Sequence, residues 1–197
     1  LPPVEMAVLA IPAQACLPAV EILSTQKGTK GFIIISAGFS EESEEGRILE
    51  EKIVRIINEH GGSLIGPNCI GIITYKHASV FTSPVPKLDQ MGCDFISSSG
   101  ATAVFIMESG IPKGLHFASV FSVGNSAQIG VEDVLEFMDE VFNPETSTRV
   151  KLLYIESIKD PDKLLKHASS LIRKGCKIAA IKAGSSQAES REAASHT

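Results

Sequence analysis

The sequence predicts an α/β fold made of two doubly wound units, each built on a parallel sheet. Short apolar runs alternate with segments of roughly 10 to 15 residues whose apolar side chains recur at helical spacing, the pattern of parallel strands joined by helices. The alternation lapses once, between residues 74 and 92, where Pro84 and Pro86 interrupt it. We therefore expect a domain boundary in this interval, which divides the chain into units 1–86 and 87–197.

The first unit opens with a predicted strand, helix and strand. Residues 6–11 and 31–36 are apolar runs typical of buried parallel strands. The residues from 17 to 23 place apolar side chains at helical spacing between these strands. Pro18 is acceptable there if it lies in the first helical turn.

A second helix and a short strand complete this unit. Ser40 is the expected N-cap, and Glu41 to Glu45 supply negative charge at the positive end of the helix. An apolar stripe follows from residue 48 to 57. Residues 63–65 form a short strand that ends in the turn Gly66-Pro67-Asn68-Cys69.

The second unit repeats the alternation with longer elements. Asp160 is the expected cap of its last helix, which Pro161 opens. The expected strands are 94–97, 119–123, 150–155 and 177–182, and the expected helices are 101–108, 131–138 and 161–172.

Composition excludes several classes of function. A net charge of −5 without a block of basic residues argues against a nucleic-acid surface. The four cysteines lie 53, 24 and 83 positions apart, so no Cys-x-x-Cys pair could bind zinc or exchange disulfides. They are expected to be reduced thiols of a cytoplasmic protein. No apolar stretch approaches the ~20 residues that span a bilayer.

The informative residues follow the predicted strands, because open parallel sheets bind ligands at the carboxyl ends of their strands. Taken singly, each such group is typical of an ordinary turn. The groups are Pro12, Ser36-Ala37-Gly38, Gly66-Pro67-Asn68, Ser97 to Gly100, Gly124-Asn125, Glu156, and the segment 182–197 with His196 near its end.

Their order and identity resemble one known family. The motifs are Ala-Val-Leu-Ala-Ile-Pro-Ala, Ile-Ile-Ile-Ser-Ala-Gly-Phe, Ile-Gly-Pro-Asn-Cys-Ile-Gly-Ile, Ile-Ser-Ser-Ser-Gly-Ala, Ser-Val-Gly-Asn, Leu-Tyr-Ile-Glu-Ser-Ile and Ala-Ala-Ser-His-Thr. The series resembles the NDP-forming acyl-CoA synthetases, which include ADP-forming acetyl-CoA synthetase and the succinyl-CoA synthetase alpha subunit, over essentially the whole chain. The resemblance implies a truncated Rossmann-like CoA-binding unit followed by a flavodoxin-like unit that ends at a phosphohistidine loop.

The resemblance also implies site residues. It places Ser36, Ala37 and Gly38 along coenzyme A, with Pro12 beside them, and Asn68 near the reacting end of the cofactor.

In the second unit, it makes Ser99, Gly100 and Ala101 the turn that opens a helix toward phosphate, where backbone N–H groups bind an anion. It makes Glu156 the carboxylate that orients the active-site imidazole. His196 is then the residue that is phosphorylated. No metal ligands are implied in this chain.

The sequence departs from the family pattern at several places. The first strand and Gly-rich turn of the family would precede Leu1, so we expect the chain to be an interior piece of a longer protein. Ser98 stands where the family often has Gln or Arg, and Val104 stands where succinyl-CoA synthetase has Tyr. No ATP-grasp segment is visible, so the nucleotide site is expected on another domain or subunit.

The leading expectation is an acid-thiol ligase that interconverts acyl-CoA, phosphate and NDP with acid, CoA and NTP. The resemblance implies that the NDP is ADP. Its implied cofactors are coenzyme A, and ATP or ADP with Mg through the ATP-grasp part. Its implied partners are that ATP-grasp part and a small carboxylic acid or acyl-CoA, in an oligomer without nucleic acid or membrane.

The alternative is a CoA-binding regulatory module without catalysis, which loss of His196 or Glu156 would favour. A serine hydrolase is a weaker reading, because the serine cluster at 97–99 lacks a Gly-x-Ser-x-Gly elbow. His60 and His167 are expected on helix surfaces.

Overall fold

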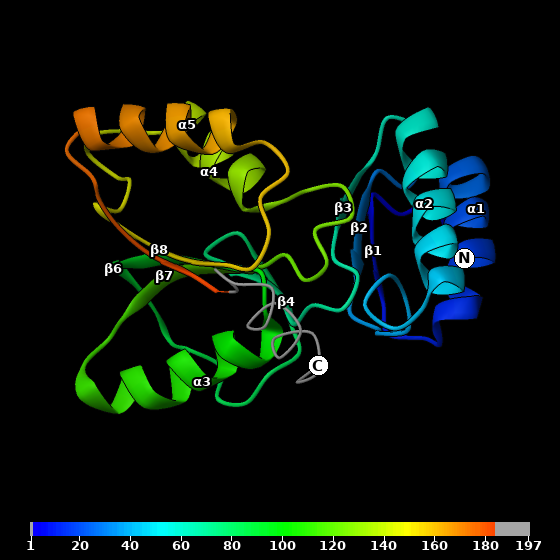
Figure 1. Cartoon of the computed structure of the whole chain (residues 1–197), viewed down its shortest axis with the longest axis horizontal. Helices are drawn as coiled ribbons and strands as arrows, with labels where there is room; N and C mark the ends of the chain where they lie inside the picture. Colours follow the sequence, from blue (N-terminus) through cyan, green and yellow to red (C-terminus); the bar gives the residue numbers. More distant parts are fainter. Residues whose placement is uncertain (1, 184–197) are drawn as a thin grey trace.

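A computed structural model describes residues 2–183 as an α/β molecule with two sheets (Figure 1). The first sheet is parallel in the order β1-β2-β3, and we call it with its two helices the first unit. The connections from β1 to β2 and from β2 to β3 run in the same direction across this sheet. Because such connections are right-handed, both helices lie on one face of the sheet. The elements are β1 (Met6–Leu9), α1 (Ala13–Lys27), β2 (Gly31–Ile34), α2 (Glu44–Glu59) and β3 (Ser63–Ile65).

The second unit is built on a six-stranded sheet in the order β5-β4-β7-β6-β8-β9. Its elements are β4 (Gly71–Thr74), β5 (His77–Val80), β6 (Leu88–Ser97), α3 (Gly100–Gly110) with a 3₁₀ turn at Ile111–Lys113, β7 (Phe117–Ser122), α4 (Val131–Glu140), β8 (Val150–Ile155), α5 (Pro161–Arg173) and β9 (Lys177–Lys182).

The winding direction of the second unit reverses after β7. The chain goes from β6 through α3 to β7, and then passes back over β6 through α4 to β8. As a result α3 covers one face, and α4 and α5 cover the other (Figure 1). The topological switch point, where such sheets bind ligands, lies between β6 and β8. The predicted α/β fold with parallel sheets is confirmed.

Two predictions about the helices of the first unit are wrong. The apolar stripe of α1 begins one turn early, at the buried residues Ala13 and Cys16, so Pro18 lies inside the helix and not in its first turn. Helix α2 is capped by Ser43, whose hydroxyl accepts from Gly46 N at 3.0 Å. Ser40 instead donates to Glu50, because the chain makes a further turn before the helix starts.

The interval after residue 74, where the alternation of predicted strands and helices is interrupted, contains a β-hairpin that the sequence analysis missed. Strands β4 and β5 pair antiparallel around Tyr75 and Lys76, and β4 also pairs antiparallel with β7. Both strands are four residues long, and neither the His77–Val80 strand nor its turn carries a strong signal. They belong to the second sheet, although they precede the predicted boundary at 86/87, which stays a prediction.

Three clusters of apolar side chains form the interior. One fills the space between the first sheet and its helices, and the other two lie on the two faces of the second sheet. Ile65 of the first unit packs on the cluster under α4 and α5, while Ala127 of the second packs on the first unit's cluster. The two units therefore share a packed contact. Within residues 2–183, no helix is long and apolar enough to cross a membrane.

Candidate functional site

The carboxyl edge of the first sheet brings the predicted coenzyme loop and the Asn68 turn together. The Ser36 hydroxyl donates to the carbonyl of Ile11, the residue before Pro12, at 2.5 Å. The Asn68 backbone N–H donates to the Ser36 carbonyl at 3.0 Å. Pro12 and Ala37 are exposed beside these bonds. Backbone contacts thus hold Pro12, Ser36 and Asn68 at one edge.

The turn between β6 and α3 is held by its own serines. Ser97 donates its hydroxyl hydrogen to the Ser99 carbonyl at 2.7 Å, and the Ser99 hydroxyl accepts from Thr102 N at 3.2 Å as an N-cap. No described histidine is hydrogen-bonded to a serine of this turn. The turn instead presents the first N–H groups of α3 at the switch point.

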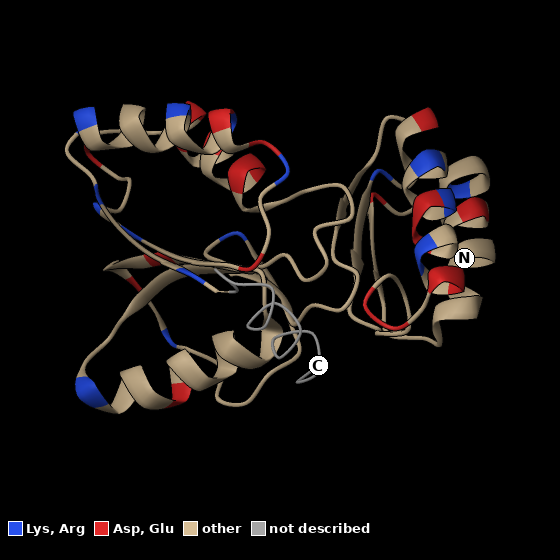
Figure 2. Cartoon of the chain, in the orientation of Figure 1, with Lys and Arg blue, Asp and Glu red and all other residues tan. Residues whose placement is uncertain are grey.

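The charge pattern distinguishes α3, which starts at the predicted phosphate turn, and α1 from the other helices. Helices α2, α4 and α5 carry acidic residues in their first turns, whereas α1 and α3 carry none. Figure 2 shows α3 almost free of charge, with both signs on α2. Acidic side chains would neutralise the positive end of a helix dipole. The starts of α1, after Pro12, and of α3, at Gly100, keep that positive end available to an anion.

Close backbone packing brings the edges of the two sheets together. A Cβ on Gly100 would lie 2.9 Å from the Ile70 side chain, two residues beyond Asn68. A Cβ on Gly124 would lie 2.1 Å from the Pro67 carbonyl, a distance that no side chain tolerates. The segments 66–70 and 97–100 therefore touch across the contact between the units.

Glu156 lies immediately after β8, on the other side of the switch point. Ser98 N donates to the Tyr154 carbonyl at 2.9 Å, so Glu156 follows the strand that borders the serine turn. Burial raises the pKa of the Glu156 carboxyl, and the positive charge of Lys182 offsets part of that rise. A half-buried carboxylate next to the start of α3 suits the orientation of an imidazole. The predicted partner, His196, lies outside the described residues.

Two further groups at this edge limit the possible chemistry. The buried Ser98 hydroxyl has no hydrogen-bond partner within residues 2–183. Burial raises the pKa of the Cys69 thiol to about 12, which keeps it protonated and unreactive. The thiol form is therefore favoured at the Asn68 turn.

The structure adds to this edge two residues to which the sequence analysis assigned no role in the site. Glu41, predicted in the first turn of a helix, instead accepts hydrogen bonds from the backbone N–H groups of Gly38 and Phe39. Asn125 crosses from the second unit to Glu41, Glu50 and Asn68. The signals for Asn125 in the sequence were its position just after a strand and the motif Ser-Val-Gly-Asn.

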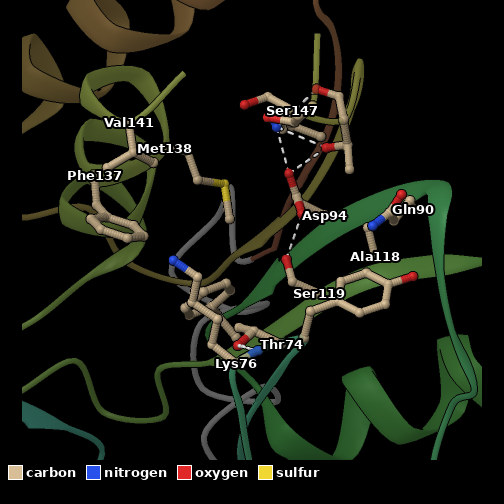
Figure 3. A pocket seen from close by; sticks show the side chains of 15 residues that line it. Thr74, Lys76, Gln90, Asp94, Ala118, Ser119, Phe137, Met138, Val141 and Ser147 are labelled. Atoms are coloured by element: carbon tan, nitrogen blue, oxygen red, sulfur yellow. Dashed lines mark hydrogen bonds and ion pairs between the residues drawn. The ribbon is translucent and has the colours of Figure 1, made fainter. Parts of the chain in front are cut away.

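A cavity of about 430 Å³ opens at the opposite, amino edge of the second sheet (Figure 3). Its floor is the buried pair of Lys151 and Asp94. Lys151 also donates to the carbonyl and hydroxyl of Thr148, and Asp94 accepts from Ser119. All three ammonium hydrogens have acceptors, so this floor is a satisfied structural pair and offers no free charge to a ligand.

Comparisons with known proteins match both units of the chain. The family model "Succinyl-CoA ligase like flavodoxin domain" matches residues 90–197, and "CoA binding domain" matches residues 1–75. An ADP-forming acetate–CoA ligase of Archaeoglobus fulgidus is 34% identical, over 98% of this chain and 27% of the relative. An ADP-forming acetate–CoA ligase alpha subunit of Pyrococcus furiosus is also 34% identical, over 98% of this chain and 41% of the relative.

Solved structures show the same relationship. A dinucleotide-forming acetyl-coenzyme A synthetase of Candidatus Korarchaeum cryptofilum matches with a TM-score of 0.82 and 29% identity, over 99% of this chain and 41% of the neighbour. An ATP citrate lyase of Methanothrix soehngenii, at 13% identity and a TM-score of 0.63 over 98% of this chain and 34% of the neighbour, shares the fold. The chain spans between 27% and 41% of the length of the two curated relatives named above. Because the flavodoxin-domain model covers more than half of its residues, and because both units and their order match, the chain belongs to the NDP-forming acyl-CoA synthetase superfamily, as the motifs predicted.

Proposed function

We propose that this chain is the acyl-CoA-handling part of an ADP-forming acid-thiol ligase. The supporting observation is that the coenzyme loop, the Asn68 turn and the start of α3 meet at one edge, next to the switch point that carries Glu156. At that edge, a thioester, a phosphate and an imidazole would lie next to one another. The relatives' names, ADP-forming acetate–CoA ligases, support this class of reaction. We propose acyl-CoA, phosphate and ADP on one side of it, and acid, CoA and ATP on the other.

The reaction has three transfers. A phosphate oxygen attacks the thioester carbonyl, which releases CoA as its thiol and leaves an acyl phosphate. His196 then attacks phosphorus, which releases the carboxylate and leaves a phosphohistidine. ADP takes the phosphoryl group and regenerates the imidazole. Such transfers depend mainly on positioning and on stabilisation of charge.

The described residues divide this work among themselves. Ser99, Gly100 and Ala101 present the start of α3 to phosphate, which needs no cationic side chain there. Glu156 holds one nitrogen of the His196 imidazole and leaves the other free to attack. Both roles stay predictions, since His196 lies outside the described residues.

Coenzyme A fits the first unit along its exposed small residues. Pro12 and Ala37 are exposed, and the Asn68 side-chain carbonyl has no hydrogen-bond partner within residues 2–183. The Gly38 N–H, however, is already bonded to Glu41, so the loop contacts the cofactor through other groups or after Glu41 moves. CoA supplies the thiol that carries the acyl group, and Pro12, Ser36, Ala37, Gly38 and Asn68 would hold it.

The other partners follow from the same proposal. ADP or ATP, with Mg, binds to an ATP-grasp domain or subunit, and the assembly is an oligomer that works on a small carboxylic acid.

The test is ATP formation by the full-length enzyme from acetyl-CoA, ADP and phosphate. We expect turnover, together with an acid-labile, base-stable phosphoryl adduct on incubation with ATP and Mg. His196→Ala should abolish both. Labelled phosphate that persists in His196→Ala would contradict the role of His196. Binding of CoA without any turnover or adduct in the wild type would instead favour the regulatory module.

A further inference from the structure

Asn125 lies where the two units meet, on a loop that belongs to the second unit. Lys159, beyond β8, donates to the Ala127 carbonyl at 2.7 Å and so fixes this loop from its own side. The Asn125 backbone N–H donates to the Pro67 carbonyl at 3.0 Å. Gly124 packs its Cα against that same carbonyl. The loop is therefore held to the second unit and pressed onto the Asn68 turn.

The side chain of Asn125 bonds in two directions. Its Oδ1 accepts from Asn68 Nδ2 at 3.4 Å. Its Nδ2 faces three oxygen atoms, on Ser40 at 3.1 Å, on Glu50 at 3.0 Å and on Glu41. Three acceptors around one end of an amide require the nitrogen there, which fixes the oxygen toward Asn68.

Glu41 carries this contact on to the coenzyme loop. One of its carboxylate oxygens accepts from Asn125, and the other accepts from Gly38 N at 2.6 Å and Phe39 N at 3.2 Å. Burial raises the pKa of the Glu41 carboxyl, but the hydrogen bonds from Asn125, Gly38 and Phe39 outweigh burial, so the pKa is lowered overall. Glu41 is therefore ionised at neutral pH and bonds the loop as an acceptor.

We propose that Asn125 is a positioning residue for coenzyme A. It bonds Asn68 directly and the Gly38 loop through Glu41, so that one side chain of the second unit sets the spacing between two segments of the first. The inference rests on the proposed function, because it requires that Asn68 and the 36–38 loop hold the cofactor.

Gln128 supplies a matched control on the same loop. It also crosses between the units, where its amide bonds Leu64 N, Asn58 and the Gly62 carbonyl. None of those groups belongs to the predicted cofactor residues. A purely structural role of the loop predicts equal effects of Asn125→Ala and Gln128→Ala.

The experiment measures KM for CoA and kcat in the full-length enzyme carrying each substitution, with acetyl phosphate or ATP plus acetate as acyl source. Asn125→Ala should raise KM for CoA by about tenfold with a smaller change in kcat, as expected when binding contacts are lost. Gln128→Ala should change KM by less than twofold. Equal KM changes in the two variants would overturn the inference.

The substitution Asn125→Asp gives a second measurement, the pH dependence of KM for CoA, which should not change if Asn125 has only a structural role. The new carboxyl group would face Glu41 and Glu50, and like charges raise the pKa of such a group. Its KM for CoA should exceed that of Asn125→Ala at pH 8 and should fall below it, toward the wild-type value, as the pH is lowered and the new group gains a proton and can donate again. If the ratio of KM for CoA between Asn125→Asp and Asn125→Ala does not change with pH, the proposal is contradicted. A wild type that neither binds nor turns over CoA would refute the proposed function itself, which is a different result.

Discussion

The two edges of the second sheet are built from the same strands but from different chemistry. At the amino edge, Asp94 and Lys151 form a buried ion pair whose donors and acceptors are satisfied by Ser119 and Thr148. At the carboxyl edge, the start of α3 lacks acidic side chains and the buried Ser98 hydroxyl has no partner within residues 2–183. Complete pairing at one edge indicates a structural role, and incomplete pairing at the other leaves groups available to a ligand.

The largest effect is expected from breaking the amino edge. Lys151→Met would leave Asp94 buried without its cation, which typically costs about 3–5 kcal/mol. Native-state hydrogen exchange in β6 and β8 of the full-length protein should show a loss of this size. The KM for CoA of the folded molecules should be unchanged. Unaltered exchange would show that the pair contributes little.

The carboxyl edge should respond in the opposite way. Glu156→Gln keeps the shape of the side chain but removes its charge, so formation of the phosphohistidine should slow by about 10²-fold, which corresponds to about 2.7 kcal/mol of barrier. Because burial raises the pKa of Glu156, the folded state disfavours its charge, and the neutral variant should be no less stable near neutral pH. Rapid-quench labelling measures the rate. An unchanged rate would remove Glu156 from the site.

A third region also holds a buried ion pair, as the amino edge does. It predicts that the stability of the fold depends on pH. Between α4 and α5, Asp139 accepts from Lys174 at 2.7 Å and contacts His167 Nδ1 at 2.9 Å. His167 is buried in this pair, so its prediction as a surface residue is wrong. Burial tends to raise the pKa of Asp139, but the bonds from Lys174, His167 and Ser170 lower it to about 2.

A depressed carboxyl pKa stabilises the fold above the unfolded value, near 3.9, and that contribution is lost as the pH falls toward 2. Asp139→Asn should therefore cost about 2 kcal/mol at pH 7, and the difference from wild type should shrink progressively below about pH 4. Exchange rates in α4 and α5 as a function of pH provide the measurement. A cost that is constant down to pH 2 would argue against the ion pair as its source.

The smallest effect is expected at the contact between the edges. In Gly100→Ala, the added methyl group would lie 2.9 Å from the Cγ2 methyl group of Ile70 and 3.5 Å from the Ile70 backbone nitrogen. The stability change should stay within about 0.5 kcal/mol, since better helix propensity offsets the contact. We expect KM for phosphate to rise about threefold as the start of α3 shifts. A rise above about thirtyfold would mean that the turn tolerates no movement.

The sequence predicted the helices and every strand except β4 and β5, because apolar periodicity and turn residues are local signals. It could not predict that Ser43 caps α2 in place of Ser40, since both are serines that precede glutamates. The bonds of Asn125 to Asn68 and Glu41 join residues 57 and 84 positions apart, which no local pattern encodes. The burial of His167 likewise depends on a partner on another helix.

The most direct test is the rate of ATP formation per folded molecule in Glu156→Gln and Lys151→Met, measured side by side in the full-length enzyme. If the two edges have separate roles, Glu156→Gln loses about 10²-fold in rate with its stability intact. Lys151→Met should then keep the wild-type rate per folded molecule despite its lost stability. Equal losses of rate in both variants would contradict the assignment of function to the carboxyl edge.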